Sequence, residues 1–404
     1  MAISKEMETL INKSQNKIKE TTSEFHRYLF DEINWEDRLI GITGARGVGK
    51  TTMLLQQIKE KYGFAPEALY VTLDDLYFTK HNLFETVEML YLNGLKHIFV
   101  DEVHKYKDWS VEIKNLYDTF SGLKIVFSGS SALSINKAKA DLSRRAAMYH
   151  LHELSFREYL ELSGVAQFSP VKFQDILANH IEASASIAEN IKPVYHFNNY
   201  LNHGVYPFFK DVKAKYHDRL LNVIQVIIEN DLVALENLNF NTLVKLKKTL
   251  ALIAESVPFK PNISELSNKV GVSRDFLVKL LHLLGDAGVI ILARQAGAPT
   301  GIMNKPEKIY MENTNLLQAL NLDNEADAGT IRETFFINQL IQQHKIEIPK
   351  AGDFLVDGAY HFEVGGKNKT MKQLAGINNS FLAIDNIEFG YKKSIPLWLF
   401  GFLY

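Results

Sequence analysis

The 404-residue sequence contains no cysteine, which excludes disulfide bonds and cysteine-ligated metal sites. The absence of cysteine fits the reducing cytoplasm, where we expect the protein to reside. No apolar run reaches the roughly 20 residues of a membrane-spanning helix, so we expect no membrane partner. The longest run, residues 395–404, predicts a buried terminal strand. The polar residues 1–37 lack the apolar centre of a secretory signal.

The sequence also lacks a strong net charge. Its formal net charge is −2, so no overall basic field attracts nucleic acid, and any basic site must be local. Hydrophobic residues make up 46% and charged residues 23% of the chain, which is typical of globular proteins. A chain of this length predicts more than one domain.

The most informative pattern is a glycine, four free positions and then Gly-Lys-Thr, which begins at Gly44 and fits the P-loop. A strand-length apolar run precedes it and a stretch of helical periodicity follows it. The glycines let backbone N–H groups surround a phosphate, and the helix N-terminus adds its positive dipole end. The alternative is an ordinary strand-to-helix turn. The predicted nucleotide-binding residues are Gly44, Ala45, Arg46, Gly47, Val48, Gly49, Lys50, Thr51 and Thr52.

Two of these residues have specific predicted roles. Lys50 can reach the β- and γ-phosphates, and the hydroxyl of Thr51 can bind Mg²⁺. A second pattern supports this chemistry, because the apolar run that begins at His97 ends in Asp101 and Glu102, as in a Walker B strand. We expect Asp101 to hold Mg²⁺ through water and Glu102 to polarise the water that attacks the γ-phosphate.

Short apolar segments alternate with helical periodicity between residues 38 and 154, which predicts an α/β fold with a parallel sheet and helices on both faces. The predicted strands are Arg38–Thr43, Ala68–Leu73, His97–Val103, Lys124–Ser128 and Ala147–Leu151.

Three further residues are candidates for catalysis. Ser128 and Ser130 follow the strand after the Walker B strand, where a hydroxyl can sense the γ-phosphate or fix the water, although a serine-rich turn is equally compatible. Arg145 is a candidate arginine finger, and a finger that acts on a neighbouring subunit requires self-association. The alternative for Arg144 and Arg145 is a solvated surface pair.

The P-loop segment, residues 99–109, Ser128–Ala132 and residues 150–160 together resemble the prokaryotic AAA-type ATPases often called archaeal-type ATPases. The resemblance extends over nearly the whole chain. It implies an ATPase domain followed by a C-terminal region that ends in a degenerate restriction-endonuclease-like fold. Arg145 matches the family's arginine, but Arg144 stands where the family has glycine.

We therefore predict five regions. They are N-terminal helices over 1–37, an AAA-type P-loop ATPase domain over 38–154, a helical linker over 155–255, a winged helix-turn-helix over 256–315 and a small endonuclease-like α/β domain over 316–404. In the winged helix, basic residues only slightly outnumber acidic ones, so double-stranded DNA and a protein-packing role both stay open. The candidate DNA contacts are Ser273, Arg274, Lys279, His282, Arg294, Lys305 and Lys308.

The C-terminal region holds a candidate second metal site formed by Asp353, Glu363 and Lys367, with Glu333 as a further acid. A nuclease of the restriction-endonuclease class needs two carboxylates and a lysine two residues after the second one. Here Lys367 lies four residues after Glu363, and a bulge at the intervening glycine pair can bring it back. The alternative is an inherited scaffold without cleavage.

The sequence thus predicts a Mg²⁺-dependent enzyme that hydrolyses ATP to ADP and phosphate and drives a conformational change in the C-terminal domains. A nucleotide-gated DNA-binding switch and an ATP-dependent nuclease are the alternatives. ATP is favoured over GTP because no Asn-Lys-x-Asp segment that reads guanine stands out.

Overall fold

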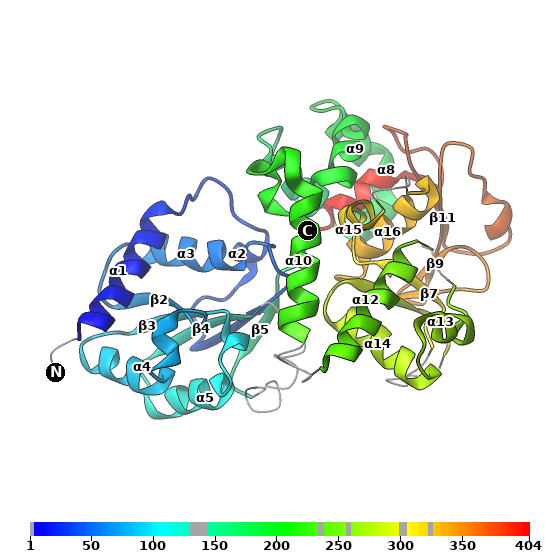
Figure 1. Ribbon diagram of the computed structural model, residues 1–404. Coiled ribbons are helices and arrows are strands. Elements are labelled where there is room, and N and C mark those ends of the chain that lie inside the picture. The colour runs from blue at the N-terminus through cyan, green and yellow to red at the C-terminus, as the bar shows by residue number, and fades with distance from the viewer. Residues whose placement is uncertain are drawn as a thin grey trace. The chain divides into compact units, whose positions relative to one another are not determined.

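The computed structural model describes residues 4–129, 142, 144–232, 238–255, 260–298, 305–321 and 326–404. The chain divides into two compact units, Met1–Glu153 and Leu154–Tyr404. The first unit is blue to teal in Figure 1, and the second runs from green to red. Among the described helices, none combines the length and the apolar character needed to cross a membrane.

The first unit is built on a parallel sheet, as predicted. In its described part, five strands lie in the order β2-β3-β4-β1-β5. The strands are β1 (Leu39–Thr43), β2 (Ala68–Thr72), β3 (His97–Asp101), β4 (Lys124–Gly129) and β5 (Ala147–His150). β3 was predicted to continue to Val103 but ends at Asp101, because Glu102 takes a left-handed backbone conformation (φ 54°) that a strand does not allow.

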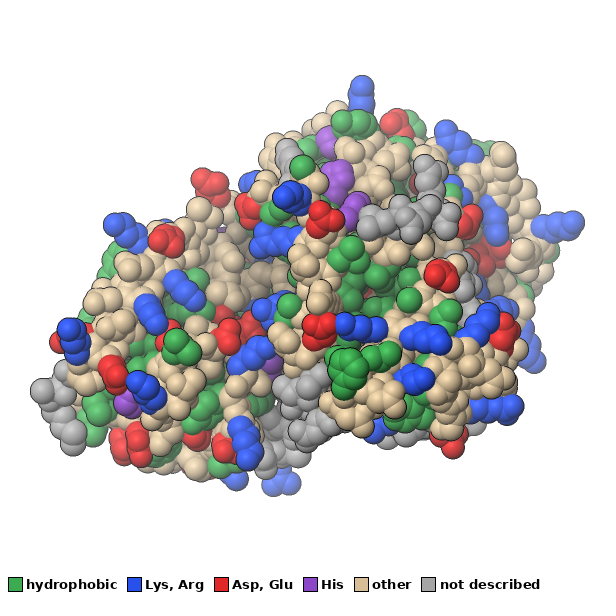
Figure 2. All heavy atoms as spheres, viewed as in Figure 1, with side chains coloured by type: hydrophobic (Ala, Val, Ile, Leu, Met, Phe, Trp, Pro, Cys, Tyr) green, Lys and Arg blue, Asp and Glu red, His purple; other side chains and the backbone are tan. Residues whose placement is uncertain are grey.

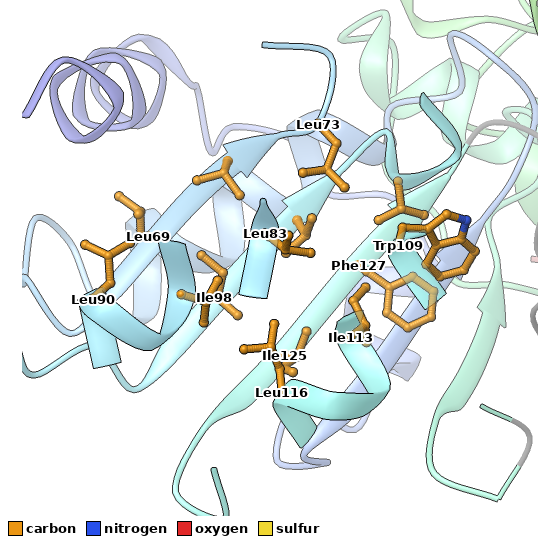
Figure 3. Packing of buried hydrophobic residues seen from close by; sticks show 14 of the residues in the cluster. Leu69, Leu73, Leu83, Leu90, Ile98, Trp109, Ile113, Leu116, Ile125 and Phe127 are labelled. Atoms are coloured by element: carbon orange, nitrogen blue, oxygen red, sulfur yellow. The ribbon is translucent and has the colours of Figure 1, made fainter. Parts of the chain in front are cut away.

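Helices cover both faces of this sheet (Figure 1). α1 packs on α3 and β2, whereas α4 and α5 pack against each other and α5 against β4. Figure 3 shows leucine and isoleucine side chains of α4 and α5 interlocking with those of β2, β3 and β4. The helical segments are α1 (Lys5–Glu20), α2 (Leu29–Glu32), α3 (Lys50–Lys61), η1 (Leu76–Thr79), α4 (Leu83–Leu92), η2 (Val103–Lys105) and α5 (Trp109–Thr119).

The second unit begins with helices. A capping box starts the first of them, since the Ser155 side chain accepts from the backbone N–H of Glu158 and the Glu158 carboxylate accepts from that of Ser155. The helical segments are α7 (Phe156–Leu162), α8 (Phe173–Ala188), α9 (Pro193–His203), η3 (Pro207–Lys210), η4 (Lys213–Lys215), α10 (Tyr216–Val226), the π-helix η5 (Ile227–Asp231), α12 (Phe240–Ala254), α13 (Ile263–Val270), α14 (Arg274–Asp286), α15 (Thr314–Leu320), α16 (Ala328–Leu340), η6 (Met371–Leu374) and η7 (Leu397–Phe402).

A mixed sheet completes the unit. Its described strands lie in the order β12-β11-β10-β9-β8-β6-β7. They are β6 (Ile290–Gln295), β7 (Lys308–Met311), β8 (Ile346–Ile348), β9 (Phe354–Val356), β10 (Tyr360–Gly365), β11 (Ser380–Ile384) and β12 (Ser394–Pro396).

The region expected to be a winged helix contains α13, a tight turn, α14 and the antiparallel hairpin of β6 and β7. Gly271 takes a left-handed conformation (φ 78°) at the end of α13, which allows the tight turn. The hairpin is not a free wing, however, because β6 also pairs in parallel with β8. The hairpin therefore belongs to the same sheet as the strands after residue 345, and the winged-helix interpretation stays a prediction.

The terminal strand predicted over residues 395–404 is wrong. β12 ends at Pro396, and the chain continues as the buried 3₁₀-helix η7. Proline has no N–H to donate to a further ladder bond, so the strand stops there. The helical turns then let Phe400 and Phe402 contact Phe336 and Trp398.

Candidate nucleotide-binding site

The P-loop connects β1 to α3, at the edge of the sheet where the parallel strands end. Gly49 precedes α3 with φ 102°, a conformation that side chains disfavour. Gly44 is required by close approach, because a Cβ there would lie 2.2 Å from the carbonyl oxygen of Leu151. The loop thus presents backbone amides and the N-terminus of α3 to one place, which is the arrangement that binds phosphate.

Lys50 lies on this loop. Its side chain is buried, and its ammonium donates to the carbonyl oxygens of Gly44 and Ala45, both at 2.8 Å. The ammonium is therefore held against the loop that would bind the phosphates. Val48 is fully buried, whereas Thr52 is exposed and Arg46 is partly exposed.

Asp101 is the point at which the predicted residues meet. Its Oδ2 accepts from the hydroxyls of Thr51 (2.6 Å) and Tyr70 (2.8 Å). Its Oδ1 accepts from the hydroxyl of Ser128 and from the backbone N–H of Glu102 (3.0 Å). The side-chain donors come from α3, β2 and β4, so the tertiary fold sets the position of this carboxylate. The side chain of Asp101 is buried.

The donor set fits a magnesium ion. Mg²⁺ prefers oxygen ligands and usually keeps several waters, so that one or two protein groups hold it beside substrate phosphates. The hydroxyl of Thr51 and the carboxylate of Asp101 are such groups, and they lie beside the phosphate-binding loop.

Glu102 follows Asp101 with the left-handed backbone noted above. For a residue other than glycine this conformation costs about 1 kcal/mol, and such strain is concentrated at functional sites. Oε2 of Glu102 lies 3.3 Å from Nε2 of the buried His104. Glu102 is therefore the first residue after β3 and directly follows Asp101 in the chain.

Sequence reasoning missed Tyr70 and Arg27. Arg27 is buried, and its guanidinium donates to the carbonyl oxygens of Val48, His152 (2.7 Å) and Glu153 (3.0 Å). It therefore ties the P-loop to the segment after β5. Burial, followed by the positive charges of His150 and Arg27, lowers the pKa of His152 to about 2, so this ring is neutral beside the guanidinium.

The remaining catalytic candidates of the first unit are Arg145 and Ser130. Arg145 makes a two-pronged ion pair with Asp118 of its own chain, with Nε at 2.9 Å from Oδ1 and Nη2 at 3.0 Å from Oδ2. A role as a finger requires release from this pair and stays a prediction. Ser130 lies outside the described residues.

With this geometry in place, comparison with known proteins identifies the first unit. Residues 36–160 match a family described as an AAA domain. These residues form an AAA-type P-loop domain. Residues 194–327 match a family described as a domain of unknown function (DUF8612).

One relative aligns with a larger part of the chain than either family does. An uncharacterized protein of Methanocaldococcus jannaschii is 26% identical over 296 residues, an alignment that covers 68% of this chain and 61% of that protein. The chain thus matches less than two thirds of this relative's length.

Two of the similar solved structures are AMPPCP-bound DnaA from Aquifex aeolicus and PCH-2 of C. elegans. The first is 13% identical with a TM-score of 0.28, covering 71% of this chain and 90% of that chain. The second is 17% identical with a TM-score of 0.24, covering 69% and 67%. Similarities at this level do not extend the assignment beyond the AAA-type domain.

Outside the AAA-type domain, the C-terminal carboxylates have an unexpected partner. Glu363 is fully buried in β10, and the ammonium of Lys369 lies 2.6 Å from its Oε1. Lys367 is exposed, so the predicted lysine is replaced by one two residues further on. The reason is steric, because a Cβ at Gly365 would lie 2.7 Å from the Lys369 side chain. The glycine makes room for Lys369 to fold back.

Asp353 lies near this pair. Burial, followed by the charge of Glu333, raises the pKa of Asp353 to about 6, although a hydrogen bond from the backbone N–H of Val364 opposes the rise. Among the residues that the structure describes, no group of three His, Cys, Asp or Glu side chains has an arrangement that could hold a metal ion. The second metal site stays a prediction.

The candidate DNA contacts separate into exposed and engaged residues. Ser273 caps α14, and Arg274 and Lys279 on that helix are exposed, as are Arg294 and Lys305. His282 is partly exposed. Lys308 is engaged, because its side chain is largely buried and its ammonium lies 3.0 Å from Oε2 of Glu333, so a contact with DNA requires release from this pair and stays a prediction.

Proposed function

We propose that the AAA-type domain binds Mg²⁺ and ATP and hydrolyses ATP to ADP and phosphate. The observation that carries the proposal is the convergence of Thr51 and Ser128 on Asp101 beside the P-loop. Backbone amides of residues 44–52 bind the triphosphate, and Lys50 neutralises charge on its β- and γ-phosphates.

Thr51 and Asp101 hold Mg²⁺, which supplies charge neutralisation on the phosphate oxygens when it is bound. Ser128 orients Asp101 through the hydrogen bond to Oδ1. Glu102 accepts a hydrogen bond from the attacking water and aligns it with the γ-phosphate. The left-handed backbone of Glu102 supports this role because such strained conformations are concentrated at functional sites.

Two variants test the assignment. Lys50→Ala should abolish ATP binding or turnover, because it removes the ammonium that the P-loop holds for the β- and γ-phosphates. Glu102→Gln should retain ATP but lower turnover by about 10²-fold or more, the usual contribution of a positioned base. Phosphate release and equilibrium binding of ATP measure the two effects separately. Wild-type turnover in either variant would contradict the assignment.

We further propose that hydrolysis drives a conformational change in the second unit. Contacts that exist only while the γ-phosphate is bound are the general means of such coupling. Limited proteolysis tests this idea when the protection of the second unit is measured once with bound ADP and once with a slowly hydrolysed ATP analogue. Identical protection in both nucleotides would count against coupling.

A second candidate function is a nucleotide-gated DNA-binding switch. Its support is the exposure of Arg274 and Lys279 on α14, and Figure 2 shows several Lys and Arg side chains gathered over α12, α13 and α14. Duplex DNA would then bind with an affinity that depends on the nucleotide and falls with salt. Arg274→Ala with Lys279→Ala should weaken that binding. DNA that neither binds nor stimulates turnover would remove this candidate.

The third candidate, an ATP-dependent nuclease, would use Asp353 and Glu363. Plasmid cleavage with Mg²⁺ or Mn²⁺, compared between the wild type and Glu363→Gln, tests it. Equal nicking by both proteins would remove this candidate.

A further inference from the structure

Tyr70 connects helix α1 to the carboxylate of Asp101, although Tyr70 belongs to none of the predicted sequence motifs. Its side chain is buried, and its hydroxyl donates to the same Oδ2 of Asp101 that accepts from Thr51. The phenol hydroxyl has a proton to donate, whereas an ionised carboxylate can only accept, so this contact orients the carboxylate oxygen.

Helix α1 fixes Tyr70 from the other side. The backbone N–H of Tyr70 points out of the edge strand β2 and donates to the hydroxyl of Ser14 at 3.1 Å. The ammonium of Lys17 lies 4.9 Å from the centre of the Tyr70 ring and 3.5 Å from its hydroxyl oxygen. A cation over an aromatic face is attracted to it, so both contacts hold the ring in one place.

From these contacts we infer that Tyr70 is a positioning residue, which orients the carboxylate of Asp101 for Mg²⁺. Because α1 holds Tyr70, the placement of α1 determines this orientation. A carboxylate can rotate about its terminal bond, because torsions of this type are broad. Thr51 and Tyr70 both donate to Oδ2, so together they select one orientation of the carboxylate. The inference rests on the proposed function, in which Asp101 holds the ion.

The structure offers a matched control. The hydroxyl of Tyr106 also donates to a carboxylate, Oε1 of Glu112, at 2.9 Å. Burial, followed by that hydrogen bond, raises the pKa of Tyr106 to about 12. Tyr106→Phe therefore removes the same chemical group from the same unit without touching Asp101.

The experiment measures binding of a fluorescent, slowly hydrolysed ATP analogue to the full chain as Mg²⁺ is titrated, so that the readout is independent of turnover. For Tyr70→Phe we expect the half-saturating Mg²⁺ concentration to rise about tenfold, the effect of losing one hydrogen bond to a charged group. Binding of the analogue without Mg²⁺ should stay within about twofold of the wild type, which also shows that the variant is folded. Tyr106→Phe should match the wild type in both measurements.

The outcomes separate the inference from the proposed function. If Tyr70→Phe has an unchanged or lower Mg²⁺ midpoint, the inference is overturned while the proposed function stands. If Tyr70→Phe loses analogue binding equally with and without Mg²⁺, the role is structural and the inference is again overturned. If the wild type itself binds no analogue, or binds it with no dependence on Mg²⁺, the proposed function fails.

Discussion

Replacement of Asp353 by asparagine should stabilise the second unit, in a manner that depends on pH. Burial and the neighbouring charge of Glu333 raise the pKa of Asp353 from its ordinary 3.8 to about 6. The folded protein therefore binds a proton, between about pH 4 and pH 6, that the unfolded chain releases. The stability that the neutral carboxyl contributes is full below about pH 4 and is lost as the pH rises through 6.

The magnitude follows from the pKa difference. About two pH units correspond to about 3 kcal/mol, an upper limit because the side chain is partly exposed and solvent screens its charge. We therefore expect Asp353→Asn to gain about 1–2 kcal/mol above pH 7. The amide oxygen can still accept from the backbone N–H of Val364, so the native hydrogen bond is kept.

Thermal unfolding of the wild type and of Asp353→Asn between pH 4 and pH 8 measures this effect. In a unit of this size the gain corresponds to a rise of roughly 2–6 °C at pH 8 that disappears near pH 4. Asp211→Asn, at an exposed site in the same unit, should show no such dependence. A variant that is no more stable at pH 8, or a difference that persists at pH 4, would refute the reasoning. Stabilisation of the wild type alone by Mn²⁺ would instead favour a metal site.

Three further expectations concern the AAA-type domain. Arg27→Met removes hydrogen bonds to three carbonyl oxygens, so we expect a loss of about 3 kcal/mol in unfolding free energy and weaker ATP binding. An unchanged melting temperature and an unchanged ATP affinity would show that these hydrogen bonds are dispensable. Ser128→Ala should lower turnover about tenfold through Asp101 while Mg²⁺-free ATP binding is kept, and full turnover would contradict the role of this hydroxyl. If Arg145 acts as a finger on a neighbouring subunit, light scattering should show a ring-sized assembly with a slowly hydrolysed ATP analogue. Arg145→Ala should then lower turnover more than Asp118→Ala, which changes only the partner of Arg145. A particle that stays monomeric would exclude action across subunits.

Local pattern was sufficient to predict the five strands of the first unit, the P-loop and the two acids at the end of β3. Each of these depends on a short run of residues whose spacing has a direct physical meaning, such as glycines before a helix or an apolar strand that ends in two acids. The same information placed Thr51, Asp101 and Ser128 at one edge of the sheet, because parallel strands end on the same side.

Contacts between distant segments could not be predicted in this way. Tyr70 reaches Asp101 across 31 positions, and Arg27 reaches Glu153 across 126, with no pattern that joins them. The glycine pair at the end of β10 was recognised, but its steric effect was assigned to Lys367 instead of Lys369, because only the path of the chain shows which lysine returns to Glu363.

The central claim is that residues 44–52 and Asp101 form a binding site for ATP with Mg²⁺. Equilibrium binding of ATP to the full chain, with and without Mg²⁺, tests it most directly when Lys50→Ala is measured beside the wild type. We expect saturable binding to the wild type that Mg²⁺ tightens and that Lys50→Ala loses. Equal affinity in the two proteins, or no binding to either, would contradict it.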